Sequence, residues 1–348
     1  MRKSSKLIST MLVASMTLSV TACGGDGTSA STGDTGAAAV SQDNSSASAE
    51  NTGNGTYEIG ILQQLEHPAL DAATEGFQDA LSDLLGEENV TFDVQNAQGE
   101  QANCSSIATT FVSSNYDLIL ANATTALQCA SAATSTIPIL GTSITDYATA
   151  LDIDNWTGAT GTNVSGTSDL APLDQQEDML VELFPDAKNV GIIYCSAEPN
   201  SAYQATKFGE YLTEDGISFK EYTIADSNDI ASVVQNAVSE VDIIYIPTDN
   251  TMASNTETIN NITLPAKVPV IAGEEGICAG CGVATLSISY YDIGYKAGEM
   301  AYEVLVNGAD ISTMEISYAP NVTKEYNPEI CEALGITVPE GYTAIETE

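Results

Sequence analysis

The residues best suited to chemistry in this sequence are mainly carboxylates, hydroxyls and amides that follow short apolar segments. In the first half of the chain they are Gln63, Leu65, His67, Asp71, Thr124, Thr125, Thr142, Ser143 and Asp146. In the second half they are Ser196, Glu198, Asn200, Ser201, Thr248, Asp249, Asn250 and Glu274. Helix capping explains Ser, Thr, Asp and Asn in any single loop. It does not by itself explain so many acids and hydroxyls at comparable positions.

The types of these residues predict binding of an α-amino acid zwitterion. No arginine follows Arg2, so the common bidentate arginine contact with a carboxylate is excluded. Hydroxyls and helix N-terminal amides can take its place, at Thr124, Thr125, Ser143 or Ser196. The ammonium group would be bound by Glu198, Asp249 and Glu274. An aromatic side chain would need apolar partners, for which the candidates are Leu65, Pro68, Trp156, Tyr290 and Tyr291.

Few residues favour catalysis. His67 is the only histidine, which excludes a multi-histidine metal site and leaves it as the sole histidine base for a catalytic triad. The sequence contains neither a GxGxxG nor a GxxxxGK[ST] motif, which disfavours a dinucleotide site and a P-loop. We therefore expect a protein that is not an enzyme and that uses no cofactor and no metal.

Six cysteines follow Cys23, namely Cys104, Cys129, Cys195, Cys278, Cys281 and Cys331. The CAGC segment ending at Cys281 has the spacing of a redox motif, but we expect it in a glycine-rich turn and not at the start of a helix. A local disulfide, two inert thiols, adventitious metal binding and a functional thiol all stay open there. Cys104 and Cys129 could pair, since both lie on predicted helices of the same lobe.

The segment 57–85 shows how such residues are positioned. A short apolar strand, Glu58–Leu62, is followed by a polar loop, by Pro68 and by helically spaced leucines up to Gly86. This strand, loop and helix form the first unit of an open parallel sheet. Further strands are predicted at Val90–Val94, Leu118–Ala121, Ile137–Gly141, Val190–Tyr194, Ser218–Tyr222, Ile243–Pro247, Val268–Ala272 and Val283–Ser287. Helices are predicted between most of them, which indicates an α/β fold.

The spacing of the strands predicts two doubly wound parallel-sheet lobes. One set of four strands spans 80 residues from Ile59 to Ile139, and a second spans 79 from Ile192 to Ile271. The Gly/Thr-rich segment 158–168 has no clear periodicity, and we expect it to be an irregular crossover. Lobe 1 is predicted to hold residues 57–163 and 287–318, and lobe 2 residues 164–286 and 319–348. Multiple crossovers then form a hinge beside a ligand cleft.

The N-terminal part resembles a targeting and tethering device. Residues 1–23 combine a basic start, an apolar stretch and Val-Thr-Ala-Cys, which resembles a bacterial lipobox with Cys23 as the lipidated residue. Residues 24–56 lack aromatic residues and are dominated by small polar ones, typical of a disordered tether. From Cys23 onward, 48 acidic residues face six lysines, which excludes nucleic-acid binding. The alternative to a lipobox at residues 20–23 is an ordinary secretory signal in which Cys23 is incidental.

Several motifs also resemble a known family. They are IGILQxxEHPALDAAxxGF from Ile59, NAQGxQ from Asn96, VSGTSDLAP from Val164, YIPTDNTMAS from Tyr245 and ISYYDIGYKAGEMA from Ile288. These motifs are similar to those of ABC-transporter substrate-binding lipoproteins that include tryptophan-binding and other aromatic amino-acid-binding members. The resemblance implies a type I periplasmic-binding-protein fold, a permease and its ATPase as partners, and ligand contacts in the loops given above.

We therefore predict a monomeric, lipid-anchored protein on the extracytoplasmic face of a bacterial membrane. It would capture an amino acid for an ABC importer by closure of the two lobes. The preferred ligand is an aromatic amino acid such as tryptophan, tyrosine or phenylalanine. A ligand sensor for a membrane receptor and a binder of a nucleoside, sugar or peptide are the alternatives. A thiol oxidoreductase built on Cys278 and Cys281 is a third class.

Overall fold

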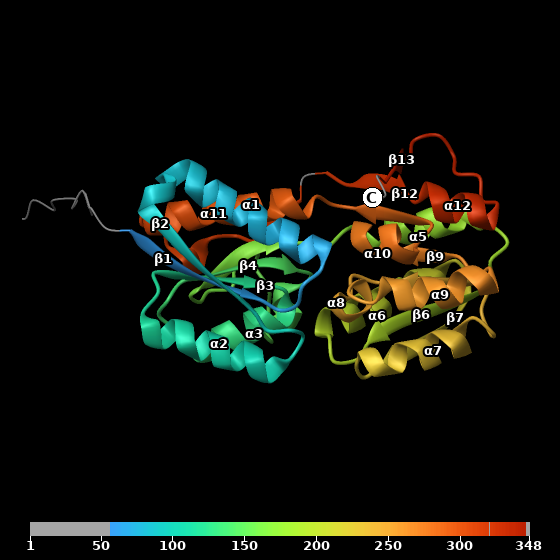
Figure 1. Cartoon of the computed structure of the whole chain (residues 1–348), viewed down its shortest axis with the longest axis horizontal. Coiled ribbons are helices and arrows are strands. Elements are labelled where there is room, and N and C mark those ends of the chain that lie inside the picture. Colours follow the sequence, from blue (N-terminus) through green and yellow to red (C-terminus); the bar gives the residue numbers. More distant parts are fainter. Residues whose placement is uncertain (1–55, 320, 346–348) are drawn as a thin grey trace, which may run out of the picture. The chain divides into compact units, whose positions relative to one another are not determined.

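The computed structural model describes residues 56–319 and 321–345. The predicted signal peptide, Cys23 and nearly all of the tether lie outside the described residues. Two mostly parallel sheets, each covered by helices on both faces, make up the described chain (Figure 1). This confirms the predicted α/β class with two doubly wound lobes. Among the described helices, none has the length and apolar character required to cross a bilayer.

Lobe 1 is built on a six-stranded sheet in the order β11-β5-β4-β3-β1-β2, in which every pairing is parallel. Its strands are β1 (Tyr57–Gln63), β2 (Val90–Asn96), β3 (Leu118–Asn122), β4 (Ile139–Ile144), β5 (Val164–Ser168) and β11 (Ser317–Tyr318). Its helices are α1 (Pro68–Leu85), α2 (Gln101–Ser114), α3 (Thr124–Ala133), α4 (Tyr147–Ala150) and α11 (Tyr290–Leu305). Single 3-10 turns lie at Glu87–Asn89 and Ile311–Thr313.

Alternate residues of these strands point to opposite faces, as expected for buried parallel strands. Ile59 and Leu120 pack with α1 and α11, whereas Leu62 and Ile119 pack with α2 and α3. Helices α1 and α11 lie side by side (Figure 1). The two helices can approach closely because Gly294 has no side chain. A Cβ atom there would clash with the carbonyl oxygen of Ala73. This packing attaches α11, which follows lobe 2 in sequence, firmly to lobe 1.

Lobe 2 is built on a seven-stranded sheet in the order β13-β12-β10-β9-β8-β6-β7, with β12 antiparallel to β10. Its strands are β6 (Asn189–Cys195), β7 (Ser218–Ile224), β8 (Ile243–Ile246), β9 (Val270–Ala272), β10 (Ala284–Ser287), β12 (Thr323–Tyr326) and β13 (Thr343–Ala344). Its helices are α5 (Leu173–Leu183), α6 (Pro199–Glu214), α7 (Ile230–Ala237), α8 (Asn250–Ala253), α9 (Thr256–Ala266), α10 (Glu275–Cys281) and α12 (Pro328–Leu334). A 3-10 turn lies at Ser227–Asp229.

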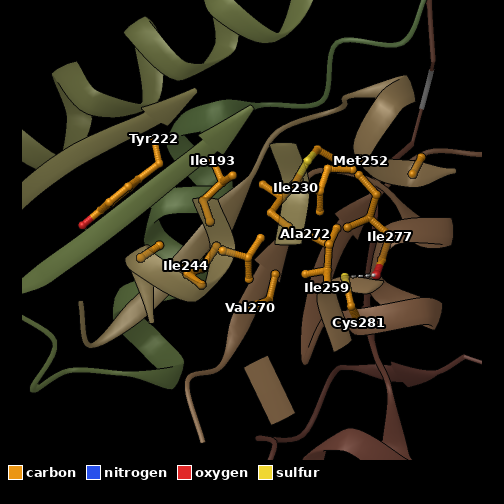
Figure 2. Packing of buried hydrophobic residues seen from close by; sticks show 14 of the residues in the cluster. Ile193, Tyr222, Ile230, Ile244, Met252, Ile259, Val270, Ala272, Ile277 and Cys281 are labelled. Atoms are coloured by element: carbon orange, nitrogen blue, oxygen red, sulfur yellow. Dashed lines mark hydrogen bonds between the residues drawn. The ribbon is translucent and has the colours of Figure 1, made fainter. Parts of the chain in front are cut away.

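The core on one face of the second sheet shows how the strands hold these helices. Ile193 of β6, Ile244 of β8 and Val270 of β9, which are neighbouring strands of the sheet, pack with Ile230 of α7 and Ile277 of α10 (Figure 2). All of these side chains are essentially inaccessible to solvent. The start of α10, which carries Glu274, is thereby fixed on the edge of the sheet.

Two predicted features are wrong. Residues 164–168 form strand β5 and not an irregular crossover, and residues 275–281 form helix α10 and not a turn. Strand β5 is rich in Ser, Thr and Gly, yet it is buried. Gly166 permits the close approach, because a Cβ atom there would meet the carbonyl oxygen of Gly141 on β4. The hydroxyl of Ser165 donates to the Met314 carbonyl at 2.9 Å, which satisfies a polar group that the apolar pattern cannot predict.

The chain passes between the lobes three times, after β5, after β10 and after β11. The boundary predicted after residue 163 is therefore one strand too early, since β5 pairs with β4 of lobe 1. Ala171, Ile288 and Val322 from the three crossovers pack with Ala69 and Ala73 of α1. These crossovers form a common hinge region beside the start of α1.

Candidate functional site

A small closed cavity lies where the carboxyl ends of both sheets meet. It is lined by His67, Leu70, Ser143, Asp169, Asn200, Thr248, Asp249, Asn250, Ala253, Glu274 and Tyr290. Its volume is about 10 Å³, enough for roughly one water molecule. Entry of a larger molecule therefore requires the lobes to separate or the side chains to move.

The lobe 1 wall offers polar atoms that have no partner. Ser143 lies within β4, where the register with β5 shifts between Gly141 and Ile144, and it has a left-handed conformation (φ 57°). Its buried hydroxyl makes no hydrogen bond within the described residues. His67 precedes Pro68 at the start of α1, and its Nε2 lies 3.1 Å from Oδ1 of Asn250 in lobe 2. The other ring nitrogen, Nδ1, is buried without a described partner. An unsatisfied buried polar group is costly, so both atoms are candidates for contact with a ligand.

The carboxylate of Asp249, in lobe 2, accepts hydrogen bonds from backbone amides of the same lobe. It caps α8 by accepting from the Met252 amide at 2.8 Å, and it accepts from the Cys195 amide at 2.7 Å. Burial, followed by the nearby charge of Glu198, raises the pKa of Asp249. Two backbone amides therefore hold this carboxylate in place at the cavity wall.

Glu198 is the most heavily bonded carboxylate of the site. It accepts from the backbone amides of Asn250 and Thr251 at 3.0 and 2.9 Å. It also accepts from the side chains of the same two residues, at 2.7 Å each, and from Asn200 at 3.3 Å. Its role here is to organise the first turn of α8, next to the cavity.

Glu274 caps the second short helix of this wall. Its carboxylate accepts from the amides of Gly276 at 2.7 Å and Ile277 at 2.6 Å, at the start of α10. Burial raises the pKa of Glu274, while the neighbouring His67 counteracts the rise. Lobe 2 thus presents two buried carboxylates, each held by amides of its own lobe.

Asp169 lines the same cavity and was not predicted. It follows β5 on the first crossover, and it accepts from the Thr145 hydroxyl at 3.0 Å and from the Tyr290 hydroxyl at 3.1 Å. Burial raises the pKa of Asp169 to about 6, although both hydroxyls oppose the rise. The signal that could have found it is the motif VSGTSDLAP, in which Asp169 directly follows the unrecognised strand.

Eight of the predicted residues line the cavity, namely His67, Ser143, Asn200, Thr248, Asp249, Asn250, Glu274 and Tyr290. Others are engaged within their own lobe. Gln63 donates to Asp71 at 2.6 Å and accepts from Thr74 at 2.7 Å. The Thr142 hydroxyl accepts from Thr167.

Four more predicted residues bond to nearby groups of their own lobe or are buried at a helix start. Asp146 caps α4 through the Thr149 amide at 2.7 Å. Ser196 and Ser201 donate to the carbonyls of Ile224 and Thr248 at 3.0 and 3.3 Å, and Thr124 is buried at the start of α3.

A polar groove of about 270 Å³ lies between residues of both lobes and has no lining residue in common with the cavity. It holds the predicted Leu65, Thr125 and Glu198, and the Thr125 amide donates to the side-chain oxygen of Gln64 at 3.2 Å. A larger groove of about 900 Å³, near the hinge, is lined by Pro68, Tyr290 and Tyr291. Trp156 instead packs against the core of lobe 1.

The six cysteines of the described chain are free and buried. Burial raises the pKa of Cys104 to about 12, and it also raises the pKa values of Cys195, Cys278, Cys281 and Cys331. Such thiols are poor nucleophiles. No group of His, Cys, Asp and Glu in the described residues has the arrangement of a metal site.

Comparison with known proteins places these features in context. Residues 58–347 match the family described as ABC transporter substrate binding protein. A tyrosine-binding protein of Clostridioides difficile (strain R20291) is 35% identical over 297 residues, which cover 84% of this chain and 86% of the relative.

Two solved structures are also similar. One is an ABC domain in complex with L-Trp from Streptococcus pneumonia, at 31% identity and a TM-score of 0.79, covering 83% of this chain and all of that one. The other is the ligand-free, open structure of a substrate-binding protein with adhesive properties from Clostridium difficile. It is 37% identical with a TM-score of 0.65, and the match covers 84% of this chain and 100% of that chain.

Proposed function

Because the chain belongs to the ABC transporter substrate-binding protein family, we propose that it captures an aromatic amino acid outside the cytoplasm for a membrane importer. The observation that carries this proposal is the cavity between the lobes. Unpartnered polar atoms lie on one wall and buried carboxylates on the other. This arrangement suits a small molecule that carries both an acid and an amine.

The two ends of a zwitterion have different partners in this proposal. The Ser143 hydroxyl and the His67 ring are available to a carboxylate. The opposite wall, with Asp249 and Glu274, attracts an ammonium group. The remaining predicted residues support these groups from the same loops.

Aromatic specificity is supported by relatives. One is a tyrosine-binding protein and another was solved with L-Trp. A ring could extend from the cavity into the 900 Å³ groove, which shares Glu274 and Tyr290 with it, when the lobes move apart. We therefore rank tyrosine, tryptophan and phenylalanine above other amino acids.

The remaining elements of the proposal concern the setting. Lipidation at Cys23 and the tether of residues 24–56 would hold a monomeric protein near the outer surface of the membrane. A permease and its cytoplasmic ATPase would receive the ligand. The relatives are substrate-binding proteins, which favours reversible binding without turnover.

A thermal-shift screen tests the proposal. The chain from Gly24, refolded to remove carried-over ligand, is mixed with each of the twenty amino acids, common sugars and nucleosides. A ligand at 100 times its dissociation constant adds about 2.7 kcal/mol, a shift of a few degrees for a protein of this size. A shift confined to aromatic amino acids supports the proposal. A shift with sugars or nucleosides alone overturns it.

A further inference from the structure

The charges around the cavity are unbalanced. Asp169, Asp249 and Glu274 line it, and all three are at most 4% exposed. None of the lining residues is lysine or arginine, and four lysines of the described chain form exposed ion pairs elsewhere. His67 is the only basic side chain at the cavity. Buried carboxylates without a counter-charge are costly, so a proton or a cationic ligand group must balance them.

The three carboxylates differ in what already holds them. Asp249 and Glu274 each accept from two backbone amides of lobe 2, which lie at the first turns of α8 and α10 and, for one oxygen of Asp249, at the end of β6. Asp169 instead accepts from the side-chain hydroxyls of Thr145 and Tyr290. A carboxylate can accept about four hydrogen bonds, so Asp169, like Asp249 and Glu274, keeps capacity for another donor. It differs from them because its partners are side-chain hydroxyls and not the backbone amides of a helix start.

Asp169 also occupies a distinctive place in the fold. It lies on the first crossover, and its partner Tyr290 lies directly after the second. The same Thr145 hydroxyl that donates to Asp169 accepts from Gln204 of lobe 2 at 3.3 Å. A chain of hydrogen bonds therefore runs from the hinge, through Asp169, to the opposite lobe.

We propose that Asp169 accepts the ligand's ammonium group, and that Thr145 and Tyr290 position its carboxylate so that binding favours the closed arrangement of the lobes. This inference rests on the proposed function and adds to it the residue that selects for a protonated amine. Asp249 and Glu274 then contribute negative potential from fixed positions, and Asp169 makes the direct contact.

The proposal predicts linkage between binding and protons. Asp169 faces Glu274 of α10, Tyr290 of α11 and Tyr147 of α4, with His67 also at the cavity. Its pKa of about 6 in the ligand-free protein falls when an ammonium group lies beside it. Binding at pH 6 therefore releases about half a proton from Asp169, and affinity rises from pH 5 to pH 7.

Two sets of ligands and two variants test this. The ligands are L-tyrosine, tyramine and 3-(4-hydroxyphenyl)propionate, with the matching tryptophan series, measured by titration calorimetry on the mature chain. Asp169→Asn removes the charge but keeps the shape, and should weaken binding of L-tyrosine and tyramine roughly ten- to a hundredfold. Asp292→Asn, which changes an exposed aspartate in the first turn of α11, should bind like wild type.

Measuring proton release on binding distinguishes titration of Asp169 from titration of His67. Calorimetry at pH 6 in two buffers of different ionisation enthalpy gives the number of protons released. Release should persist in His67→Gln and should fall by about half a proton in Asp169→Asn. In Tyr290→Phe, which removes a hydrogen bond that lowers the pKa of Asp169, the midpoint of release should move to higher pH. A merely structural role for Tyr290 would not move this midpoint.

The outcomes distinguish this inference from the proposed function. If wild type binds aromatic amino acids but Asp169→Asn binds them equally well, the Asp169 assignment is wrong and the proposed function stands. If the deaminated acids bind as tightly as the amino acids, selection for an ammonium group is also wrong. If tyramine or tryptamine binds but the amino acids do not, the proposed function fails and the ammonium site remains. If no compound of either series binds, both fall.

Discussion

The two walls of the cavity are built differently. On the lobe 2 side, the carboxylates of Asp249, Glu274 and Glu198 are bound by backbone amides of their own lobe. On the lobe 1 side, Ser143 Oγ and His67 Nδ1 have no described partner. The carboxylates of the lobe 2 wall are used to hold the helices of that lobe in place. The lobe 1 wall has polar atoms that are free to bond to a ligand. Substitutions on the two walls should therefore fail in different ways, one in stability and the other in binding.

The largest effect should come from Glu198→Ala. This change removes the acceptor for two backbone amides and three side chains at the start of α8. Breaking such a buried charged network should lower the free energy of unfolding by about 3–5 kcal/mol. Urea denaturation measures it, with exposed Glu257→Ala as a control expected to change stability by less than about 0.5 kcal/mol. Equal midpoints for the two variants would contradict the description of the lobe 2 wall.

The next effect concerns Asp169, which belongs to the hinge and not to either wall. Its pKa is about 6 in the folded protein, above the ordinary value of 3.8. The folded state thus holds the proton more tightly, and the stability from this group is fully present below pH 4 and lost as pH rises through 6. The loss is on the order of 2–3 kcal/mol.

Chemical denaturation of ligand-free protein between pH 4 and pH 8 measures this loss, and Asp169→Asn should remove this part of the slope. Asp249 and Glu274 also have raised pKa values from burial, so wild type should keep losing stability in the same direction at higher pH. A wild-type protein whose stability rises between pH 5 and pH 7 would disprove the assigned burial of these groups.

Much of this organisation is visible in the sequence, and particular residues show why the rest is not. Strands such as Val190–Tyr194 are continuous apolar runs, so their positions could be predicted. Strand β5 could not, because its polar side chains are satisfied by distant partners such as the Met314 carbonyl. Asp169 could not be predicted for the same reason. It lies at the cavity only because it follows β5, which pairs with β4 of lobe 1.

The predicted site shows a similar limit. Residues from several of the predicted loops line one cavity, but a Ser or Asp in a loop can face that cavity or cap its own helix. Asp146 caps α4, whereas Ser143, only three residues earlier, lines the cavity. The backbone of Ser143 adopts a left-handed conformation that turns it there, and sequence alone does not specify this.

The lobe 1 wall should respond through binding. Ser143→Ala removes a buried hydroxyl that has no described partner, so the free energy of unfolding should stay the same or rise by up to about 1 kcal/mol. Affinity for the aromatic ligand should fall about tenfold, the value of one hydrogen bond to a charged group. Ser165→Ala is the matched control, because its buried hydroxyl donates to Met314. It should lose about 1 kcal/mol of stability and keep its affinity. The reverse pattern would show that Ser143 supports the fold.

The smallest effect should arise where the two walls touch. Gln204 of lobe 2 donates across the cleft to Thr145 at 3.3 Å, a long and uncharged hydrogen bond worth about 0.5–1.5 kcal/mol. Gln204→Met removes this bond together with the bonds of the side chain to the Asn200 and Thr248 backbone within lobe 2. Because only the bond to Thr145 requires the lobes to be together, ligand dissociation should become about two- to tenfold faster while association stays unchanged. Stopped-flow fluorescence measures both rates. Gln128→Met is the control, since Gln128 donates within lobe 1 to the Ala150 carbonyl. A slower association with unchanged dissociation would mean that Gln204 shapes the open lobe and does not hold the closed one.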